Sequence, residues 1–326
     1  MPAISASAPG KIILFGEHAV VYSRPAIAIP LMQLKATAYF LADPTAPLGN
    51  IKLTAADIGM QTNLNDLAED HPFRVLFQLV QKHFQLDHFP AMSVKIRSEI
   101  PIAAGLGSGT AVSVALIRGL SLFLGVKLSA AQISALAFEV EKIYHRTPSG
   151  VDNTVITYEK PVFFMKDHLP EPIYVGNDCV FLIADTGIKS MTSSVVGEVR
   201  INWENNRKHY ESNFDSIASI TQDAKEMLIS GDEKQVGELM NKNHHLLVQM
   251  GVSCDQLDHL VTSALRAGAL GAKLSGAGKG GNIIALVQES SARDVRLALE
   301  NAGATRVIQI TLNKTESTKT AKKVIS

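Results

Sequence analysis

Residues 101–110 read PIAAGLGSGT and lie between an apolar strand pattern and the start of an amphipathic helix. The glycines Gly105, Gly107 and Gly109 allow the backbone to approach a ligand closely and to take positive φ angles. The helix that follows offers unpaired N–H groups and the positive end of its dipole, which favour a polyphosphate. The stretch therefore indicates a phosphate-binding loop, although an ordinary glycine-rich turn before a helix fits it equally well when it is taken alone.

Outward from this loop, the chain alternates between strand and helix patterns. Apolar residues at three- and four-residue steps predict a helix that ends at Gly125, and Ser129 with Gln132 forms a capping box for a second helix that stops before Pro148. Short β-like runs predict strands at residues 11–15, 26–29, 36–41, 92–96, 155–158, 162–165 and 180–184. The segment 161–172 contains three prolines and is the expected crossing between two halves.

The second half is mainly helical. Helical spacing runs from Trp203 to Gly231, from Asp232 to Met250 and again up to Gly268, and strands are expected at 272–275, 282–287 and 306–312. We detect no internal repeat, and the pattern predicts an α+β fold. The expected organisation is an N-terminal domain over residues 1–166, a C-terminal domain over 167–312 and a polar, flexible tail over 313–326.

Composition narrows the class of protein. Of 326 residues, 46% are hydrophobic, and 31 Lys and Arg balance 31 Asp and Glu, as in a soluble globular protein without a basic nucleic-acid surface. The isolated Cys179 and Cys254 suggest neither a zinc site nor a disulfide framework. No apolar run reaches the roughly eighteen residues of a membrane span, and residues 1–8 do not resemble a signal peptide. We therefore expect a cytoplasmic protein without nucleic-acid or membrane partners.

A second glycine-rich stretch, KLSGAGKGGN at residues 273–282, formally satisfies G-x-G-x-x-G. A dinucleotide fingerprint must open a helix, whereas residues 283–287 have a strand pattern. The Walker A pattern also fails, because Lys279 is followed by Gly280 instead of Ser or Thr. The remaining interpretation is a flexible loop that closes over phosphates or substrate.

Two further segments carry candidate chemistry. Glu141 and Asp152 flank the turn at residues 148–150, so one carboxylate could hold a cation while the other accepts a proton. A solvated helix glutamate and a turn aspartate are the commoner arrangement when such a pair is met in isolation. Near the N-terminus, Lys11 opens a strand and Glu17 with His18 lies in the turn after it, where burial would require polar partners.

Four stretches, APGKIILFGEH (8–18), PIAAGLGSGTA (101–111), HRTPSGVDN (145–153) and KLSGAGKGG (273–281), resemble the superfamily of galactokinase, homoserine kinase, mevalonate kinase and phosphomevalonate kinase. The resemblance covers residues 7–312. Within that superfamily, GEHAVVY together with TPSGVDN is most similar to the mevalonate kinases. The resemblance implies two α+β domains with the active site in the cleft between them. It also implies magnesium-dependent transfer of the γ-phosphoryl group of ATP to the 5-hydroxyl of mevalonate, an early step of isoprenoid biosynthesis.

The resemblance also implies individual roles. Asp152 would accept the proton, Lys11 would lie beside it, and Glu141 with Ser108 would hold magnesium. The phosphates would be wrapped by Ala104, Gly105, Leu106, Gly107, Ser108, Gly109 and Thr110. The mevalonate pocket would be lined by Glu17, His18, Ser149 and Thr192, with Lys166 for the carboxylate, and the loop Ser275, Gly276, Ala277 and Gly278 would border the reacting centre.

The sequence departs from the family pattern in two places. The family commonly has a serine pair where this chain has Ser108 and Gly109, which leaves Ser108, Thr110 or water to complete the metal shell. Arg146 stands where a glycine is usual. The alternatives are a sibling kinase for phosphomevalonate, a sugar or the mevalonate 3-hydroxyl, and a non-catalytic nucleotide-binding relative. Members of the family often form homodimers.

Overall fold

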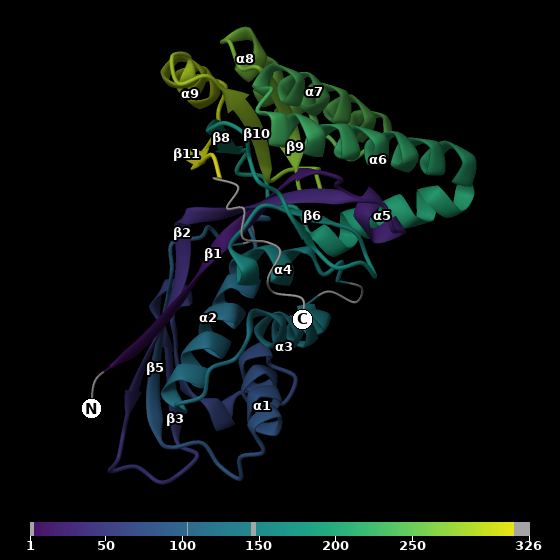
Figure 1. The fold of residues 1–326 in the computed structure, drawn as a ribbon. Coiled ribbons are helices and arrows are strands. Elements are labelled where there is room, and N and C mark those ends of the chain that lie inside the picture. The colour runs from purple at the N-terminus through teal and green to yellow at the C-terminus, as the bar shows by residue number, and fades with distance from the viewer. Residues whose placement is uncertain (1–2, 103, 145–147, 316–326) are drawn as a thin grey trace. The chain divides into compact units, whose positions relative to one another are not determined.

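The computed structural model describes residues 3–102, 104–144 and 148–315, and the chain divides into two compact units (Figure 1). The first unit comprises Met1–Ile12 and Pro30–Lys160, and the second comprises Ile13–Ile29 and Pro161–Ser326. Residues 13–29 thus group with the C-terminal unit, although the sequence assigns them to the N-terminal domain. The reason is that strands β1 (Ile4–Phe15) and β2 (Ala26–Ala42) each contribute residues to both units.

The first unit is built on a sheet in the order β4-β3-β5-β2, and β1 also pairs with β2. Its other strands are β3 (Ile51–Ala55), β4 (Met60–Asn63) and β5 (Met92–Ser98). β3 runs parallel to β5, whereas β2 and β5 pair antiparallel from Ala36↔Ser98 to Ala42↔Met92. Alternate residues such as Ala38, Phe40 and Val94 are buried, so one face of the sheet supports the helices.

Helices α1 (Pro72–Phe84), α2 (Ser108–Phe123) and α3 (Ala130–Tyr144) lie on one side of this sheet (Figure 1). Gly119 of α2 allows close packing, since a Cβ at this position would lie 2.0 Å from the Phe40 ring. The capping box predicted for the second helix is confirmed. The Ser129 N–H donates to Gln132 Oε1 at 2.9 Å, and the Gln132 N–H donates to Ser129 Oγ at 3.3 Å.

Residues 155–158, predicted as a strand, belong to helix α4 (Val151–Tyr158), so this prediction is wrong. The helix begins after Gly150, which adopts φ 89°, and Thr154 Oγ1 donates to the Gly150 carbonyl at 2.7 Å. Val151, Val155 and Ile156 are fully buried. Burial of this helical face therefore outweighs the β propensity of the branched residues.

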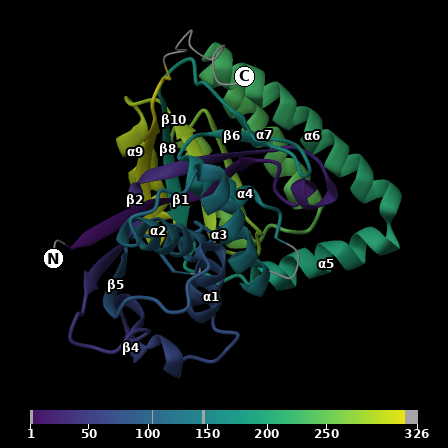
Figure 2. The same cartoon turned by 60° about the horizontal axis from the view of Figure 1, so that its bottom comes forward.

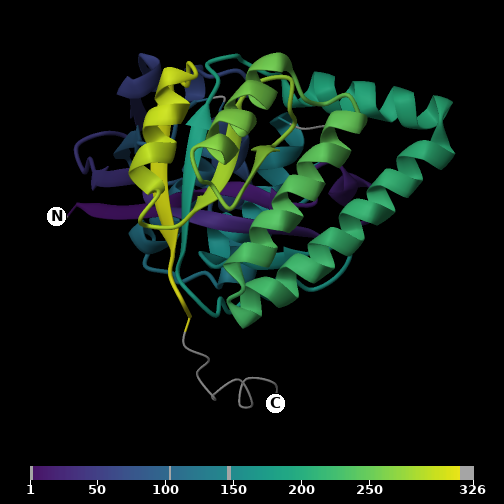
Figure 3. The ribbon, with the colours of Figure 1, turned by 90° about the horizontal axis from the view of Figure 1, so that it is seen from above.

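The second unit contains an antiparallel sheet in the order β11-β8-β10-β9. Its strands are β8 (Cys179–Asp185), β9 (Gly271–Ser275), β10 (Asn282–Val287) and β11 (Arg306–Leu312). Helices α6 (Arg207–Ser230), α7 (Glu233–Gln249), α8 (Asp255–Arg266) and α9 (Ala292–Asn301) lie over one face of the sheet, as the green to yellow ribbons of Figure 3 show. β6 (Val162–Phe164), which itself pairs with β7 (Glu171–Pro172), pairs with the first residues of β2 from Ala26↔Phe164.

The predicted helix from Trp203 onward is instead two helices, because α5 (Thr192–Asn205) ends before Asn206, whose φ and ψ are −143° and 61°. Figure 2 shows the bend between α5 and α6. Across the bend, Trp203 Nε1 donates to Glu211 Oε1 at 2.8 Å. The short helix η1 (Ala19–Tyr22) packs beside it, with the Tyr22 ring 5.2 Å from the Trp203 ring.

The first residues of the expected tail form two hydrogen bonds. The Thr315 N–H donates to the Val175 carbonyl at 3.0 Å, and the Lys314 N–H donates to Asp178 Oδ1 at 2.5 Å. In the part of the chain that the structure describes, no helix combines the length and apolarity needed to span a membrane.

Candidate active site

The first unit brings together the two residues that the sequence assigns to catalysis. Lys11 Nζ lies 2.9 Å from Asp152 Oδ1. The lysine is nearly buried, with 7% of its side chain exposed, whereas 26% of the aspartate side chain is accessible. Lys11 comes from β1 and Asp152 from the first turn of α4, so their meeting depends on the tertiary fold. The pair places a fixed positive charge beside a carboxylate that a reactant can still reach.

The glycine-rich loop packs against the same lysine. The Lys11 N–H donates to the Leu106 carbonyl at 2.9 Å. Gly107 adopts φ 73°, and a Cβ there would lie 2.9 Å from Ile156 Cδ1 and 3.0 Å from Lys11 Cγ. Because α2 begins at Ser108, its unpaired N–H groups lie at the end of this loop. The loop therefore leads directly into the N-terminus of a helix, as anion-binding loops do, and is not a simple turn.

Glu141 of α3 is the second acidic group of the site, and only 5% of it is exposed. Thr110 Oγ1 donates to Glu141 Oε1 at 2.5 Å. Burial, reinforced by the negative charge of Asp152, raises the pKa of Glu141 to about 8, although Thr110 and Lys11 oppose this rise. The two carboxylates and Lys11 therefore interact electrostatically, and burial of Glu141 is the main reason that its pKa is raised.

Arg118 of α2 holds the segments that carry these residues. Its guanidinium donates to the Ser7 carbonyl of β1 at 2.8 Å and to the Thr157 carbonyl of α4 at 2.7 Å, and it pairs with Glu159. One partly buried side chain thus ties the strand of Lys11 to the helix of Asp152. No motif in the sequence indicates this role for Arg118, which lies outside the apolar stripe of its helix.

Ser108 and Ser149, which the sequence also assigns to the site, do not take part in the hydrogen bond between Thr110 and Glu141. Ser108 Oγ is 3.5 Å from Ser98 Oγ, so Thr110 rather than Ser108 is the hydroxyl on Glu141. Ser149 Oγ accepts from the Val151 N–H at 3.4 Å at the start of α4. Arg146 lies outside the described residues. Among the described residues no group of three His, Cys, Asp or Glu side chains is arranged to hold a metal ion.

In the second unit, Glu17 is directed into the core. Its carboxylate forms an ion pair with Lys273 of β9, and both side chains are completely buried. Lys273 Nζ also donates to the Leu274 carbonyl at 2.8 Å. Burial lowers the pKa of Lys273, whereas the Glu17 charge raises it. The structure therefore places Glu17 against a buried cation.

His18 follows Glu17 and adopts φ 60°, which few residues other than glycine do. Its Nε2 lies 2.8 Å from the Ala277 carbonyl oxygen, and burial lowers the pKa of His18 to about 4. Because a carbonyl oxygen only accepts, the neutral imidazole carries its proton on Nε2. Nδ1 is then an acceptor, and it is buried without a hydrogen-bond partner within the described ranges.

The backbone of the loop after β9 adopts conformations that require glycine. Gly276 and Gly278 adopt φ 93° and 86°, and a Cβ on Gly278 would lie 1.9 Å from the Val252 carbonyl oxygen. Ser190 Oγ donates to the Gly278 carbonyl at 2.5 Å. β10 follows the loop, which confirms the rejection of a dinucleotide fingerprint.

Thr192 and Lys166, also predicted to bind substrate, are both exposed. Thr192 is the first residue of α5. The contacts among the described residues assign neither of them a role.

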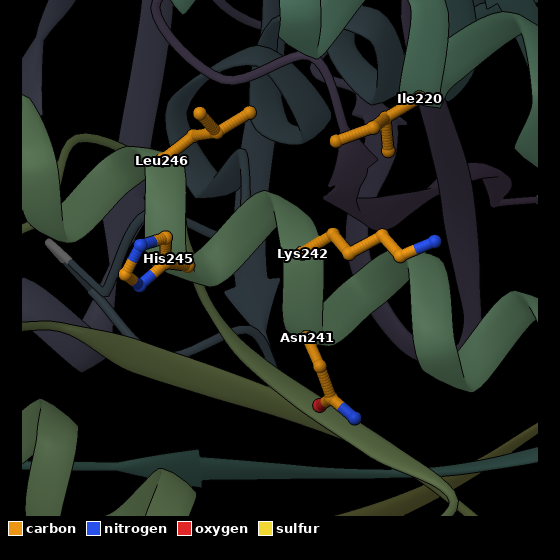
Figure 4. A pocket seen from close by; sticks show the side chains of 5 residues that line it. All are labelled: Ile220, Asn241, Lys242, His245 and Leu246. Carbon is orange, nitrogen blue, oxygen red and sulfur yellow. The ribbon is translucent and has the colours of Figure 1, made fainter.

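Two surface hollows are separate from these residues. One, of about 450 Å³, lies between α6 and α7 and is lined by Ile220, Asn241, Lys242, His245 and Leu246 (Figure 4). There Asn241 is directed toward β9, where its Oδ1 accepts from the Ala272 N–H at 2.9 Å. The other, of about 480 Å³, lies on β2 and β5 beside Tyr39 and Lys95. Neither hollow contains a residue that the sequence assigns to the site.

The motif KLSGAGKGG begins with Lys273, but the motif alone indicates no role for this residue. The sequence does carry a signal for its placement. Lys273 lies in a strand pattern between Ala272 and Leu274, two residues before Ser275, and alternate strand residues share one face, so Lys273 is expected on the same face as Ser275.

Comparison with known proteins identifies the family. Residues 72–160 match the GHMP kinases N terminal domain, and residues 224–305 match the GHMP kinases C terminal domain. A mevalonate kinase of Pyrococcus abyssi is 37% identical over 331 residues, covering 94% of each chain. One from Thermococcus onnurineus is 37% identical over 334 residues, covering 94% of this chain and 95% of the relative.

Solved structures give the same result. L. major mevalonate kinase in complex with R-mevalonate has a TM-score of 0.82 at 27% identity, covering 95% of this chain and 96% of that one. The Methanococcus jannaschii mevalonate kinase also has a TM-score of 0.82 at 27% identity, covering 97% and 99%. The motifs, the two matched domains and the full-length similarity together show that the chain belongs to the mevalonate kinase family of the GHMP kinases.

Proposed function

We propose that this protein transfers the γ-phosphoryl group of ATP to the 5-hydroxyl of mevalonate, giving 5-phosphomevalonate and ADP. The observation that carries the proposal is the 2.9 Å contact of Lys11 with Asp152, beside a glycine loop that opens α2. Phosphoryl transfer depends mainly on positioning and on neutralising charge, and this arrangement supplies both.

Asp152 is the proposed proton acceptor. The developing bond joins the mevalonate oxygen to the γ-phosphorus, the bond to the ADP oxygen breaks, and the hydroxyl proton passes to the carboxylate. Lys11 holds this carboxylate and contributes positive charge to the transferring group. The N–H groups at the start of α2, with the loop from Ala104 to Thr110, bind the phosphates.

Glu141 and Thr110 are the proposed holders of magnesium. The fit rests on Glu141 itself, a buried carboxylate that accepts a hydrogen bond from Thr110 and whose pKa is raised mainly by burial and further by the charge of Asp152. Carboxylate and hydroxyl oxygens are ligands that Mg²⁺ prefers. When bound, the ion would neutralise phosphate charge. Ser108 remains a candidate ligand of lower priority because its hydroxyl lies beside Ser98.

The second unit is proposed to recognise mevalonate. His18 offers Nδ1 as an acceptor for a substrate hydroxyl, and the loop Ser275 to Gly278 adjoins it through the Ala277 carbonyl. Glu17 acts in this proposal through its contact with Lys273, while Ser149, Thr192 and Lys166 are further candidates for substrate contact.

The test is an acceptor panel with ATP and magnesium, comparing mevalonate, phosphomevalonate, galactose and homoserine by ADP release. Phosphorus NMR of the product then distinguishes 5-phosphomevalonate from the 3-phosphate. Turnover with mevalonate alone supports the proposal. Preference for another acceptor would assign a sibling activity, and tight calorimetric binding of ATP and mevalonate without turnover would favour a non-catalytic relative.

We further propose that the protein is a cytoplasmic homodimer. The cytoplasmic location is supported by Cys179 and Cys254, which are both free thiols. The dimer is supported by the family resemblance. Light scattering after size-exclusion chromatography measures the mass in solution, and a mass equal to the 35.1 kDa chain would contradict the dimer.

A further inference from the structure

Alternate residues of β9 hold the segment that precedes His18. Ser275 Oγ donates to the Ile13 carbonyl of β1 at 2.7 Å, and two residues earlier Lys273 pairs with Glu17. Residues two apart in a strand share a face, so both contacts come from one side of β9. The turn after β1 is thus fastened to β9 by one neutral hydrogen bond and one ion pair.

Lys273 is a fully buried cation that pairs with Glu17. Besides Glu17, the ammonium meets the Leu274 carbonyl, and its charge helps to lower the pKa values of His18 and His244. His244 Nδ1 accepts from the Leu274 N–H at 3.3 Å. A fully buried ammonium is stable only when it is paired, so Lys273 constrains where the Glu17 carboxylate lies.

The turn itself is strained and therefore needs such constraints. His18 has φ 60°, and Gly16 has φ 93° with no room for a side chain, since a Cβ would lie 2.4 Å from the Pro25 carbonyl oxygen. Strained backbone persists when the surrounding contacts over-determine it. For His18 those contacts are the Glu17 ion pair before it and the Ala277 carbonyl on its ring.

We propose that Lys273 is a positioning residue for substrate binding, which holds Glu17 in the core and so fixes His18 with Nε2–H on Ala277 and Nδ1 as the acceptor for a substrate hydroxyl. Lys273 acts through Glu17 and does not contact the substrate. The inference rests on the proposed function, because it concerns recognition of the hydroxyl-bearing acceptor.

A double-mutant cycle tests this dependence. K273M and E17Q are each expected to raise the KM for mevalonate about tenfold, while the KM for ATP stays within about twofold of wild type. Because the two residues act as one unit, K273M/E17Q is expected to raise the mevalonate KM no further than either single variant. Additive effects would show that Glu17 binds substrate independently of Lys273 and would overturn the inference.

Imidazole NMR supplies a readout that loss of stability alone does not change. In ¹⁵N-labelled protein the His18 signals, assigned with H18Q, are expected to show a neutral ring with its proton on Nε2. In K273M they are expected to show mixed tautomers and titration closer to that of an ordinary histidine. If K273M does not fold, K273M/E17Q, which leaves no unpaired buried charge, takes its place in this measurement.

K225M is the matched control, because Lys225 forms a 2.6 Å ion pair with Glu171 in the same unit and only 15% of its side chain is exposed. It is expected to keep wild-type mevalonate KM and His18 signals. Wild-type values of both in folded K273M or K273M/E17Q would overturn the inference. Absence of mevalonate turnover in the wild type would instead refute the proposed function, so the two failures are distinguishable.

Discussion

Lys11 Nζ and Asp152 Oδ1 lie 2.9 Å apart, one on the strand that precedes the Gly16 turn and the other in the first turn of α4. The ion pair is partly buried and is supported by Arg118, which bonds both segments. A contact between segments so distant in sequence requires the whole first unit to be folded. The pair is therefore a property of the fold as much as of the motifs.

Loss of either member of this pair should abolish most activity. D152N removes the proton acceptor and K11M removes the adjacent charge, so each is expected to lower kcat on the order of 10²- to 10⁴-fold. Steady-state assays with saturating ATP and mevalonate measure the change. The control is K52M, which breaks the exposed 3.2 Å pair with Asp43 in the same unit and should leave kcat unchanged. Wild-type kcat in D152N would contradict the assigned role.

The Thr110 hydroxyl, which donates to Glu141, should affect magnesium dependence more than the Ser108 hydroxyl does. T110V removes the 2.5 Å hydrogen bond to Glu141 and is expected to raise the magnesium concentration for half-maximal activity about 10- to 100-fold. T110S keeps the hydroxyl and should stay close to wild type. S108A is expected to change magnesium dependence less than T110V, and the reverse order would assign the metal contact to Ser108.

Two glycines of the phosphate loop should respond differently to alanine. In G107A the new Cβ would meet Ile156 and Lys11 at a φ of 73°, so we expect loss of activity and a free energy of unfolding lower by about 1–3 kcal/mol. At Gly109 a Cβ meets nothing within 4 Å in the helix, so G109A should raise the free energy of unfolding by about 0.5–1 kcal/mol. Urea unfolding of both variants measures these changes, and equal destabilisation would contradict the packing argument.

Periodicity and capping signals predicted much of the fold. The Ser129 capping box and the start of α7 after Asp232 were readable because their signals are local. The strand predicted at 155–158 failed because burial of Val155 and Ile156 on one helical face overrides local propensity. The break at Asn206 was missed because the apolar spacing continues from α5 into α6.

The sequence predicts those site residues that belong to a recognisable motif. It does not predict a role that depends on which side chain a residue contacts in the fold. Lys11 and Asp152 were assigned from their motifs and lie in contact. The roles of Thr110 and Lys273 depend on which side chain each one meets, and no spacing rule links Thr110 to Glu141 or Lys273 to Glu17. Such long-range contacts become visible only in the folded chain.

Acid should destabilise the second unit through the buried His18 and the partly buried His244. Burial lowers the pKa values of His18 and His244 to about 4 from the ordinary 6.5, so the unfolded chain binds more protons between these values. The contribution of these two histidines to the free energy of unfolding is therefore expected to be greatest above pH 6.5 and to fall toward pH 4. Glu141, whose pKa is raised from 4.5 to about 8, contributes a change of the opposite sign between those two values. Each imidazole would contribute a slope of up to about 1.4 kcal/mol per pH unit. Urea unfolding at several pH values measures this dependence.

The variant H244Q isolates one of these two contributions. Without the imidazole, the slope between pH 6.5 and pH 4 should decrease by up to about 1.4 kcal/mol per pH unit, even though the variant is less stable at neutral pH. H88N, at an exposed histidine of the first unit, serves as the control and should keep the wild-type slope. An unchanged slope in H244Q would mean that His244 is already protonated in the folded protein between pH 4 and pH 6.5. Only a histidine that is neutral in the folded protein and protonated in the unfolded chain makes the free energy of unfolding fall with decreasing pH.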